Sequence, residues 1–314
     1  MIPKNMPEKY DNNSLVNTLH SKYIFARIKQ MRYTIAQFRE DFPDDRACLL
    51  AVLGNRYGRT CPRCGSIGVK WYPITGRQGF VCSDCDSHVY PLAQTIFRKS
   101  STSLWNWFYA IYLFSVSKNG VSAKELERQL GVTYKTAWRM CKQIRLLMQN
   151  DSEGYMLEDE VEVDETYIGG RHRKSYRYSK KQAVFGAVER KGKIKVKHVK
   201  STGARVLLPE IYQGVLPGTM IYSDEWRAYS KLNYYGYGHR TVNHSRWEWS
   251  RDTAYTNTIE GFWGHLKRSL RGTYGHVSGK YLQLYLGEFA YRYNRRSQNE
   301  PIFLDLFQRA AMLS

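Results

Sequence analysis

The sequence predicts a multidomain protein in which a cysteine-rich ribbon and a helical region precede an α/β domain. Its 314 residues exceed the ~100–200 residues of a typical single domain. Four cysteines cluster between positions 61 and 85, and the apolar pattern changes from helical spacing to alternation after residue 150. We therefore expect four segments, namely a helical segment at 1–58, the ribbon at 59–100, a second helical region at 101–150 and the α/β domain at 151–314.

The composition is that of a folded and strongly basic chain. Hydrophobic residues make up 42% of it, which is enough for real cores and excludes a disordered chain, a collagen or a coiled-coil rod. There are 48 Lys and Arg against 28 Asp and Glu, so the formal net charge is +20. A protein tolerates this self-repulsion most readily when its partner is a polyanion, and the 25 tyrosines also suit nucleic acid. A ribosomal or membrane-surface protein would share the charge, so composition favours nucleic acid without identifying it.

No signal for export or membrane insertion is recognisable. The first ten residues are polar, and the longest apolar run, 104–116, is shorter than the ~20 residues that cross a bilayer. Six cysteines in a chain without an export signal indicate a reducing compartment. We expect a soluble protein without a membrane partner, in the cytoplasm and nucleoid of a bacterial host or in the nucleus of a eukaryotic one.

Apolar spacing and turn residues predict the order of the elements. Two short helices are expected between 34 and 56, with Asp44 as the N-cap of the second. Further helices are expected at 102–117, 122–130, 133–149, 204–212, 257–270 and 279–296. Strands are expected at 161–168, 183–188, 194–199, 220–223 and near 240–243. The mixture of strands and helices after residue 150 indicates one α/β domain.

The clustered cysteines form two C-x₂-C motifs that 17 residues separate: Cys61, Cys64, Cys82 and Cys85. Four thiolates at this spacing are typical of a tetrahedral structural zinc site, in which each motif supplies two ligands from a tight turn. Free thiols or a redox pair are the alternative, although two paired motifs arise by chance more rarely than one. His88 is expected on the surface because the four cysteines already complete the ligand set. The segment 59–100 is therefore predicted to be a zinc ribbon, with a hairpin turn at 75–77.

The helical pair at 122–130 and 132–148, with Gly131 between them, has the outline of a helix-turn-helix. Leu126 and Leu130 are expected to face the core, and the second helix carries a buried stripe at helical spacing: Ala137, Cys141, Ile144 and Met148. Five residues are left on the outside of that helix as candidate DNA contacts: Thr133, Tyr134, Lys135, Arg139 and Lys142. An ordinary helical bundle with a solvated basic face is the alternative.

Three acidic residues of the α/β domain lie where stability alone would not place them. Asp164 lies in an alternating strand, although Asp is depleted in strands. Asp224 directly follows the apolar strand at 220–223, at the end where open α/β sheets bind ligands. Glu260 lies at the start of a helix. In so basic a protein, a converging acidic trio would supply oxygen ligands for two Mg²⁺ ions, which suit phosphodiester chemistry.

Each acid also has a plain structural interpretation. Asp164 could be one member of a solvated acidic run at 159–165. Asp224 could cap the N-terminus of a helix, and Glu260 could complete a capping box with Asn257. The predicted metal site would be absent only if all three of these interpretations were correct.

Five segments carry a resemblance to a known family. They are 161–170 (VEVDETYIGG), 221–224 (IYSD), 257–263 (NTIEGFW), 273–278 (TYGHVS) and 288–295 (EFAYRYNR). Together they resemble the Merlin-type DDE transposases and their bacterial insertion-sequence relatives. The resemblance extends over almost the whole chain, from residue 34 to about residue 296, and includes the ribbon and the helix-turn-helix.

The resemblance implies a ribonuclease-H-like catalytic domain, with Asp on its first strand, Asp after its fourth and Glu on a later helix. Carried over to this sequence, these catalytic, metal-binding residues are Asp164, Asp224 and Glu260. Asn257 is the alternative for the third position, because some relatives use Asn there. Lys267 matches a basic residue with which related enzymes contact DNA near the active site.

The resemblance also implies a function. The ribbon and helix-turn-helix would bind terminal inverted repeats of double-stranded DNA, and the catalytic domain would cleave the element ends with two Mg²⁺ or Mn²⁺ ions. The freed 3′-OH would then join target DNA by transesterification. The basic segment 171–200, which includes Arg171, Arg173 and Lys174, would follow the DNA backbone, and pairing of two ends implies a homodimer or larger assembly. A catalytically silent DNA-binding regulator derived from a transposase and a nuclease on the same fold are the alternatives.

Overall fold

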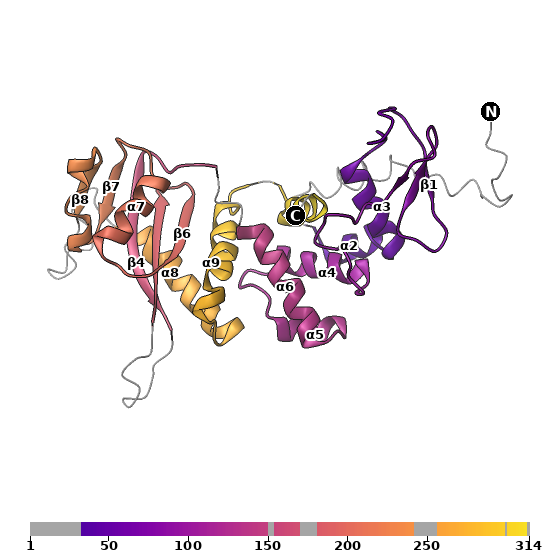
Figure 1. The fold of residues 1–314 in the computed structure, drawn as a ribbon. Helices are drawn as coiled ribbons and strands as arrows, with labels where there is room; N and C mark the ends of the chain where they lie inside the picture. The colour runs from indigo at the N-terminus through magenta and orange to yellow at the C-terminus, as the bar shows by residue number, and fades with distance from the viewer. Residues whose placement is uncertain (1–32, 150–153, 170–180, 242–255, 299, 313–314) are drawn as a thin grey trace. The chain divides into compact units, whose positions relative to one another are not determined.

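The computed structural model describes residues 33–149, 154–169, 181–241, 256–298 and 300–312 (Figure 1). Internal contacts divide the chain into two compact units. The first consists of Met1–Ser117, Leu126–Met140 and Gln298–Ser314, and the second of Lys118–Glu125 and Cys141–Ser297. Among the described residues, no helix is both long and apolar enough to span a membrane.

Four helices of the first unit share an aromatic core. They are α2 (Ile35–Asp41), α3 (Asp45–Arg56), α4 (Leu104–Val116) and α10 (Ile302–Ala311). Asp44 caps α3 as expected, because its side chain accepts the N–H of Ala47 at 2.8 Å. Phe303 of α10 packs on Phe38 and Phe42, with ring centroids 5.9 and 5.8 Å away.

Helix α10 is not among the helices expected from the sequence. Its apolar residues recur at helical spacing and are buried: Phe303, Leu304, Leu306, Phe307, Ala310 and Ala311. We expect this segment to belong to the domain 151–314, whereas in the structure it packs against α4 and α3 of the first unit. Such pairing of a chain end with an element some 190 positions earlier leaves no local signal.

A small antiparallel sheet follows α3. Its strands are β1 (Trp71–Pro73), β2 (Phe80–Cys82) and β3 (His88–Val89), in the order β1-β2-β3. The expected hairpin turn joins β1 to β2. Trp71 and Phe80 are buried against Leu53 of α3, and the indole N–H of Trp71 donates to the Gly58 carbonyl at 2.9 Å.

Helices α5 (Ala123–Leu130) and α6 (Tyr134–Gln149) flank a tight turn. Gly131 has a φ of +64°, which is the left-handed conformation that glycine adopts readily after a helix. The Thr133 hydroxyl accepts the N–H of Thr136 at 3.3 Å and thereby satisfies an orphan donor of α6. Leu126 and the whole expected stripe of α6 are buried: Ala137, Cys141, Ile144 and Met148.

The second unit contains a mixed sheet of five strands. These are β4 (Glu160–Ile168), β5 (Gln182–Glu189), β6 (Ile194–Val199), β7 (Met220–Ser223) and β8 (Gly238–Thr241). Their order is β6-β5-β4-β7-β8; β4, β5 and β6 pair antiparallel, and β7 is parallel to both β4 and β8. The expected strands are all present within two or three residues of their boundaries.

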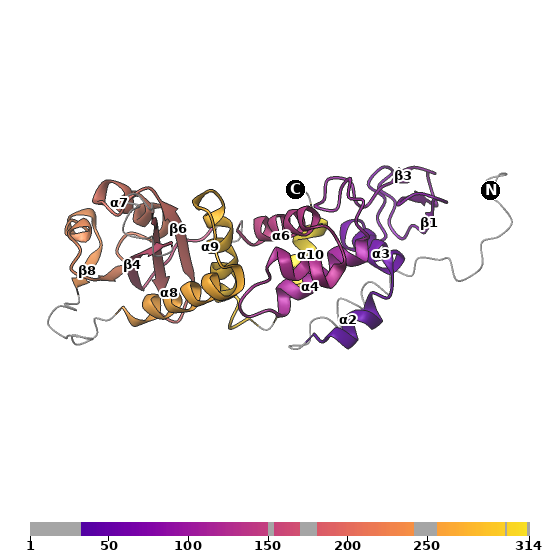
Figure 2. The ribbon, with the colours of Figure 1, turned by 90° about the horizontal axis from the view of Figure 1, so that it is seen from below.

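Helices cover both faces of this sheet (Figure 2). Helix α7 (Ala204–Gly214) packs on the face that carries Val161 and Val163 of β4. Helices α8 (Asn257–Ser269) and α9 (Gly279–Asn294), joined through the π-helical turn η6 (Leu270–Tyr274), pack on the opposite face. Because side chains alternate along a strand, Glu162 and Asp164 lie on the α8 face. The alternation of β4 therefore directs Glu162 and Asp164 towards α8, and Glu165 towards the opposite face.

Candidate functional site

The four cysteines form a compact group that fits a metal ion. All four Sγ atoms lie within 4.8 Å of one another, and those of Cys61 and Cys85 are 3.8 Å apart. A tetrahedral Zn²⁺ with Zn–S bonds of ~2.3 Å requires sulfur atoms roughly 3.8 Å apart, so the donor set suits zinc in both chemistry and spacing. His88 is exposed, as expected.

The two cysteine turns have matching backbone hydrogen bonds. The N–H of Arg63 donates to the Sγ of Cys61, and the N–H of Asp84 donates to the Sγ of Cys82, each at 3.4 Å. Each donor therefore lies two residues after the first cysteine of its motif. Such N–H donors stabilise thiolate charge, which is the form that binds a metal.

Asp164 and Asp224 lie on neighbouring parallel strands. Glu162 of β4 is in register with Tyr222 of β7. Continuing this parallel register for two residues brings Asp164 alongside Asp224, directly beyond the last residue of β7. The structure thus brings together two acids that are 60 positions apart in the sequence.

The local electrostatics indicate that negative charge is concentrated there. Burial, with the nearby charges of Glu165 and Asp224, raises the pKa of the Asp164 carboxyl to about 7. Burial and the charge of Asp224 also raise the pKa of Glu165, while a hydrogen bond from the Tyr229 hydroxyl opposes that shift. A bound cation relieves this repulsion, because it favours the ionised form of carboxyl groups such as Asp164 and Glu165. The donor chemistry fits Mg²⁺ or Mn²⁺, which prefer oxygen ligands.

A tryptophan of α8 orients Asp164. The indole N–H of Trp263 donates to Oδ2 of Asp164 at 2.9 Å. Gly186 of β5 is the strand partner of Asp164, and a Cβ there would lie 2.6 Å from Cζ2 of Trp263. Only glycine leaves room for the ring, so this position on β5 allows α8 to lie close enough for the hydrogen bond.

Glu162 holds the beginning of α8 and was not singled out in the sequence. It is fully buried, and its Oε2 accepts the N–H groups of Thr258 at 2.9 Å and Ile259 at 3.1 Å. Its Oε1 accepts the Thr258 hydroxyl at 2.9 Å and Nε of Arg190 at 3.2 Å. A carboxylate at this position satisfies orphan N–H donors and interacts favourably with the helix dipole.

The capping box considered for Asn257 and Glu260 is not formed. The N-cap of α8 is Thr256, whose side chain makes no capping bond. Glu162 supplies the acceptor instead, from a strand 96 positions earlier in the chain. The only sequence signal for this role was the alternation that placed Glu162 on the face of Asp164.

Glu260 lies in the first turn of α8 and is exposed. Its Oε1 accepts the Thr256 hydroxyl at 3.0 Å. In the described residues, the four cysteines are the one group of three or more Cys, His, Asp or Glu whose ligand atoms lie within 4.8 Å of one another. Glu260 therefore belongs to the helix that contacts Asp164, but its carboxylate is not at metal-ligand spacing from Asp164 and Asp224.

The candidate DNA contacts that the structure describes lie on two helices. On α6, Tyr134, Lys135 and Arg139 are exposed and Lys142 is half-buried, while Lys267 is exposed on α8. Arg171, Arg173 and Lys174 lie outside the described residues.

The described part of the basic segment 171–200 lies mostly in two strands of the sheet, and several of its lysines are exposed. Residues 182–189 and 194–199 form β5 and β6, and the guanidinium of Arg190 lies 3.8 Å from the ring centroid of Tyr222. The ammonium groups of Lys193 and Lys195 lie 4.4 and 4.8 Å from the ring centroid of Tyr155.

Comparison with known proteins agrees with the motifs. Residues 156–294 match the ISXO2-like transposase domain, and residues 43–88 match the transposase zinc-ribbon domain. An uncharacterized transposase-like protein of Haemophilus influenzae is 33% identical over 96 residues, which are 31% of this chain and 76% of that protein. The resemblance drawn from the sequence is confirmed, and the chain belongs to the family of ISXO2-like transposases that carry a zinc ribbon ahead of the transposase domain.

Proposed function

We propose that the protein is a DNA transposase that cleaves the ends of its element and joins the freed 3′-OH to target DNA. The observation that carries the proposal is that Asp164, in the middle of β4, lies alongside Asp224, which directly follows the parallel strand β7, and that the pKa of Asp164 rises there to about 7. Three antiparallel strands followed by a parallel one, with helices on both faces, also support a ribonuclease-H-like domain.

Asp164 and Asp224, with Glu260, would hold two Mg²⁺ or Mn²⁺ ions. When bound, these ions would activate the attacking oxygen and stabilise the leaving oxygen of a phosphodiester. The protein's own contribution is to fix the ligands. Trp263 holds one rotamer of Asp164, and the hydrogen bonds of Glu162 set the position of the first turn of α8, which carries Glu260.

DNA binding would be shared between α6 and α8. The exposed Tyr134, Lys135 and Arg139 of α6 support a helix-turn-helix that contacts the terminal repeats, with Lys142 at its margin. Lys267 lies seven residues after Glu260, hence on the same face of α8, where its ammonium group can bind a phosphate close to the carboxylates. Two element ends must be paired for transposition, so we expect at least a homodimer.

A cleavage and joining assay tests the proposal. The wild-type protein and Asp224→Asn would be incubated with Mg²⁺ and DNA that carries the sequences flanking the gene. We expect wild-type cleavage and strand transfer, both lost in Asp224→Asn while DNA affinity is unchanged. Binding without cleavage by either protein, in Mg²⁺ and in Mn²⁺, would instead identify a DNA-binding regulator. Cleavage without joining would identify a nuclease.

A further inference from the structure

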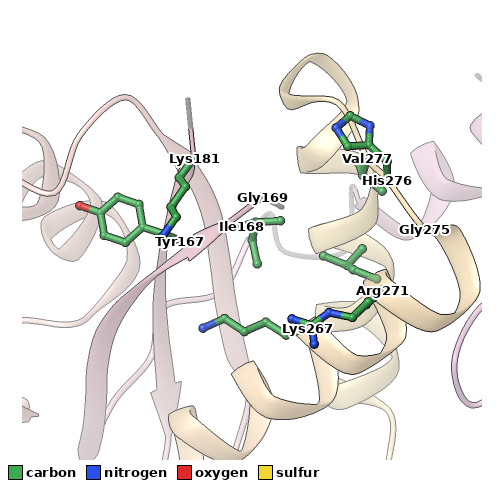
Figure 3. A pocket seen from close by; sticks show the side chains of 10 residues that line it. Tyr167, Ile168, Gly169, Lys181, Lys267, Arg271, Gly275, His276 and Val277 are labelled. Carbon is green, nitrogen blue, oxygen red and sulfur yellow. The ribbon is translucent and has the colours of Figure 1, made fainter. Parts of the chain in front are cut away.

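A cavity of about 590 Å³ opens beside the carboxylates, between the end of β4 and the C-terminal part of α8 (Figure 3). Its lining residues are Tyr167, Ile168, Gly169, Lys181, Lys267, Leu270, Arg271, Gly275, His276 and Val277. Figure 3 shows Tyr167 and Lys181 on the sheet side and Lys267 and Arg271 on the helix side. The volume falls within the range of small-molecule pockets, about 300–1,000 Å³.

The cavity combines cations with an apolar surface. Lys181, Lys267 and Arg271 are exposed, and within the described part of the chain no carboxylate forms an ion pair with any of them. Ile168 and Leu270 contribute apolar surface. Cations without a neighbouring acid favour an anionic ligand, and the apolar surface indicates that this ligand also has a non-polar part.

The aromatic ring in the cavity is that of Tyr167, and a contact of its hydroxyl group fixes its position. The side chain of Tyr167 is 50% exposed, and its hydroxyl lies 3.1 Å from the hydroxyl of Thr202. The indole N–H of Trp226, two residues after Asp224, donates to the carbonyl of the same Thr202 at 2.8 Å. A half-exposed ring whose hydroxyl is held in this way suits stacking of a nucleic-acid base.

The cavity lies next to the carboxylates along both elements that form it. On β4, Ile168 follows Asp164 by four residues and lies on the same face. On α8, Lys267 lies one helical turn after Trp263, whose indole is hydrogen-bonded to Asp164. Four residues advance ~6 Å along a helix and ~13 Å along a strand, whereas a DNA strand advances ~3.4 Å per nucleotide, so the cavity is about two to four nucleotides from the carboxylates.

The helix side of the cavity has an irregular backbone. Leu270–Tyr274 form a π-helical turn, a rare feature that occurs frequently at functional sites. Arg271 lies in this turn, four residues after Lys267, and Gly275 follows it with a φ of +68°. The turn thus places a second cation beside the first and ends the helix at the cavity.

We propose that this cavity binds an unpaired nucleotide of the DNA strand, within about four positions of the phosphodiester that is cleaved. Lys267 and Arg271 bind its phosphate, with Lys181 opposite, and the base stacks on Tyr167. A paired base remains stacked inside the duplex and cannot enter a pocket, so the occupant is a nucleotide that has left the helix at a DNA end. The inference rests on the proposed function, because the cleaved strand supplies the nucleotide.

The test compares two DNA duplexes that share one strand, whose sequence is taken from the flank of the gene. One is fully paired, and in the other the last two base pairs are replaced by mismatches. Affinity for the full-length protein would be measured by fluorescence anisotropy in Ca²⁺ instead of Mg²⁺, so that the DNA stays intact. We expect the frayed DNA to bind roughly tenfold more tightly, which is the size of one stacking contact.

Two variants and two controls locate the effect. Tyr167→Ala and Arg271→Ala should lose most of the tenfold preference while keeping the affinity for paired DNA within about twofold. Tyr234→Ala and Lys231→Ala remove an exposed tyrosine and an exposed lysine of the same unit outside the cavity, and both should keep the preference. In addition, 5-iodouracil at an unpaired position should photocross-link to the peptide that contains Tyr167.

The outcomes separate this inference from the proposed function. The cavity is not the binding site if wild type binds both DNA molecules equally, if the two cavity variants keep the preference, or if the controls lose it. Loss of the preference in the cavity variants alone supports the inference even when wild type fails to cleave in Mg²⁺, and that failure would count against the transposase activity only.

Discussion

Trp263 donates its indole N–H to Oδ2 of Asp164, and this hydrogen bond joins α8 to the strand that carries the first candidate catalytic acid. The bond favours the ionised carboxylate and therefore lowers the pKa of Asp164, against burial and the charges of Glu165 and Asp224, which raise it to about 7. A carboxylate must be ionised to bind a metal ion. The acid limb of the activity profile should consequently lie near pH 7 at low Mg²⁺ concentration and move to lower pH as Mg²⁺ saturates the site.

The variant Trp263→Phe tests that relationship. It removes the donor but keeps an aromatic ring, so the pKa of Asp164 should rise and the acid limb of the cleavage rate should move to higher pH. We expect the limb to move by about one pH unit, since one charge-assisted hydrogen bond is worth roughly 1.5 kcal/mol. Cleavage measured from pH 5.5 to 9 in Mg²⁺ gives the shift. Phe262→Leu, which alters the neighbouring aromatic residue without touching the hydrogen bond, should leave the limb in place.

Glu162 is expected to be essential for stability rather than for chemistry. In Glu162→Ala the N–H groups of Thr258 and Ile259 lose their acceptor, and Arg190 loses its closer ion pair while its contact with Glu160 at 3.4 Å remains. Unsatisfied buried donors and a broken buried ion pair together cost about 2–4 kcal/mol. Urea denaturation measures this loss.

Glu158→Ala is the matched control, because Glu158 directly precedes the acidic run at 159–165 and is exposed. Its free energy of unfolding should change by less than ~0.5 kcal/mol. Equal stability of the two variants would contradict the role assigned to Glu162.

Local sequence patterns were sufficient for the ribbon and for the sheet. Four cysteines at fixed spacing define their own turns, and alternation along β4 is a property of the strand itself, so both could be predicted from neighbouring residues. Asp164 and Asp224 were identifiable because each occupies an unusual place relative to a strand.

The missed features all depend on partners that are distant in sequence. Glu162 accepts the N–H of Thr258, 96 positions later in the chain, and alternation along β4 indicates its face but not this partner. Gly186 owes its role to the ring of Trp263, a contact that exists only after α8 has packed on the sheet. A pattern of residues predicts an element, whereas such contacts depend on how the elements pack.

The zinc ribbon should depend on one metal ion per chain. Metal analysis of the purified protein should find one Zn²⁺, and Cys61→Ser or Cys85→Ser should abolish it, because three thiolates do not complete a closed structural site. The variant Cys48→Ala removes a buried cysteine outside the group and should retain the zinc. Loss of zinc should lower the thermal stability of the ribbon, since binding of the metal is coupled to folding. A full zinc content in Cys61→Ser and Cys85→Ser would show that the cysteines do not bind it.

Lys135 of α6 should bind DNA mainly through a phosphate. Its side chain is exposed at the beginning of the helix, in the position that a helix lying in the major groove would present to DNA. Lys135→Ala should therefore weaken binding of any DNA sequence and reduce the slope of log K against log[salt] by about 1. Affinities measured between 50 and 200 mM salt give both quantities. Lys231→Ala, which removes an exposed lysine of the sheet domain, provides the reference slope. A slope for Lys135→Ala equal to those of wild type and this reference would show that α6 does not contact the DNA backbone there.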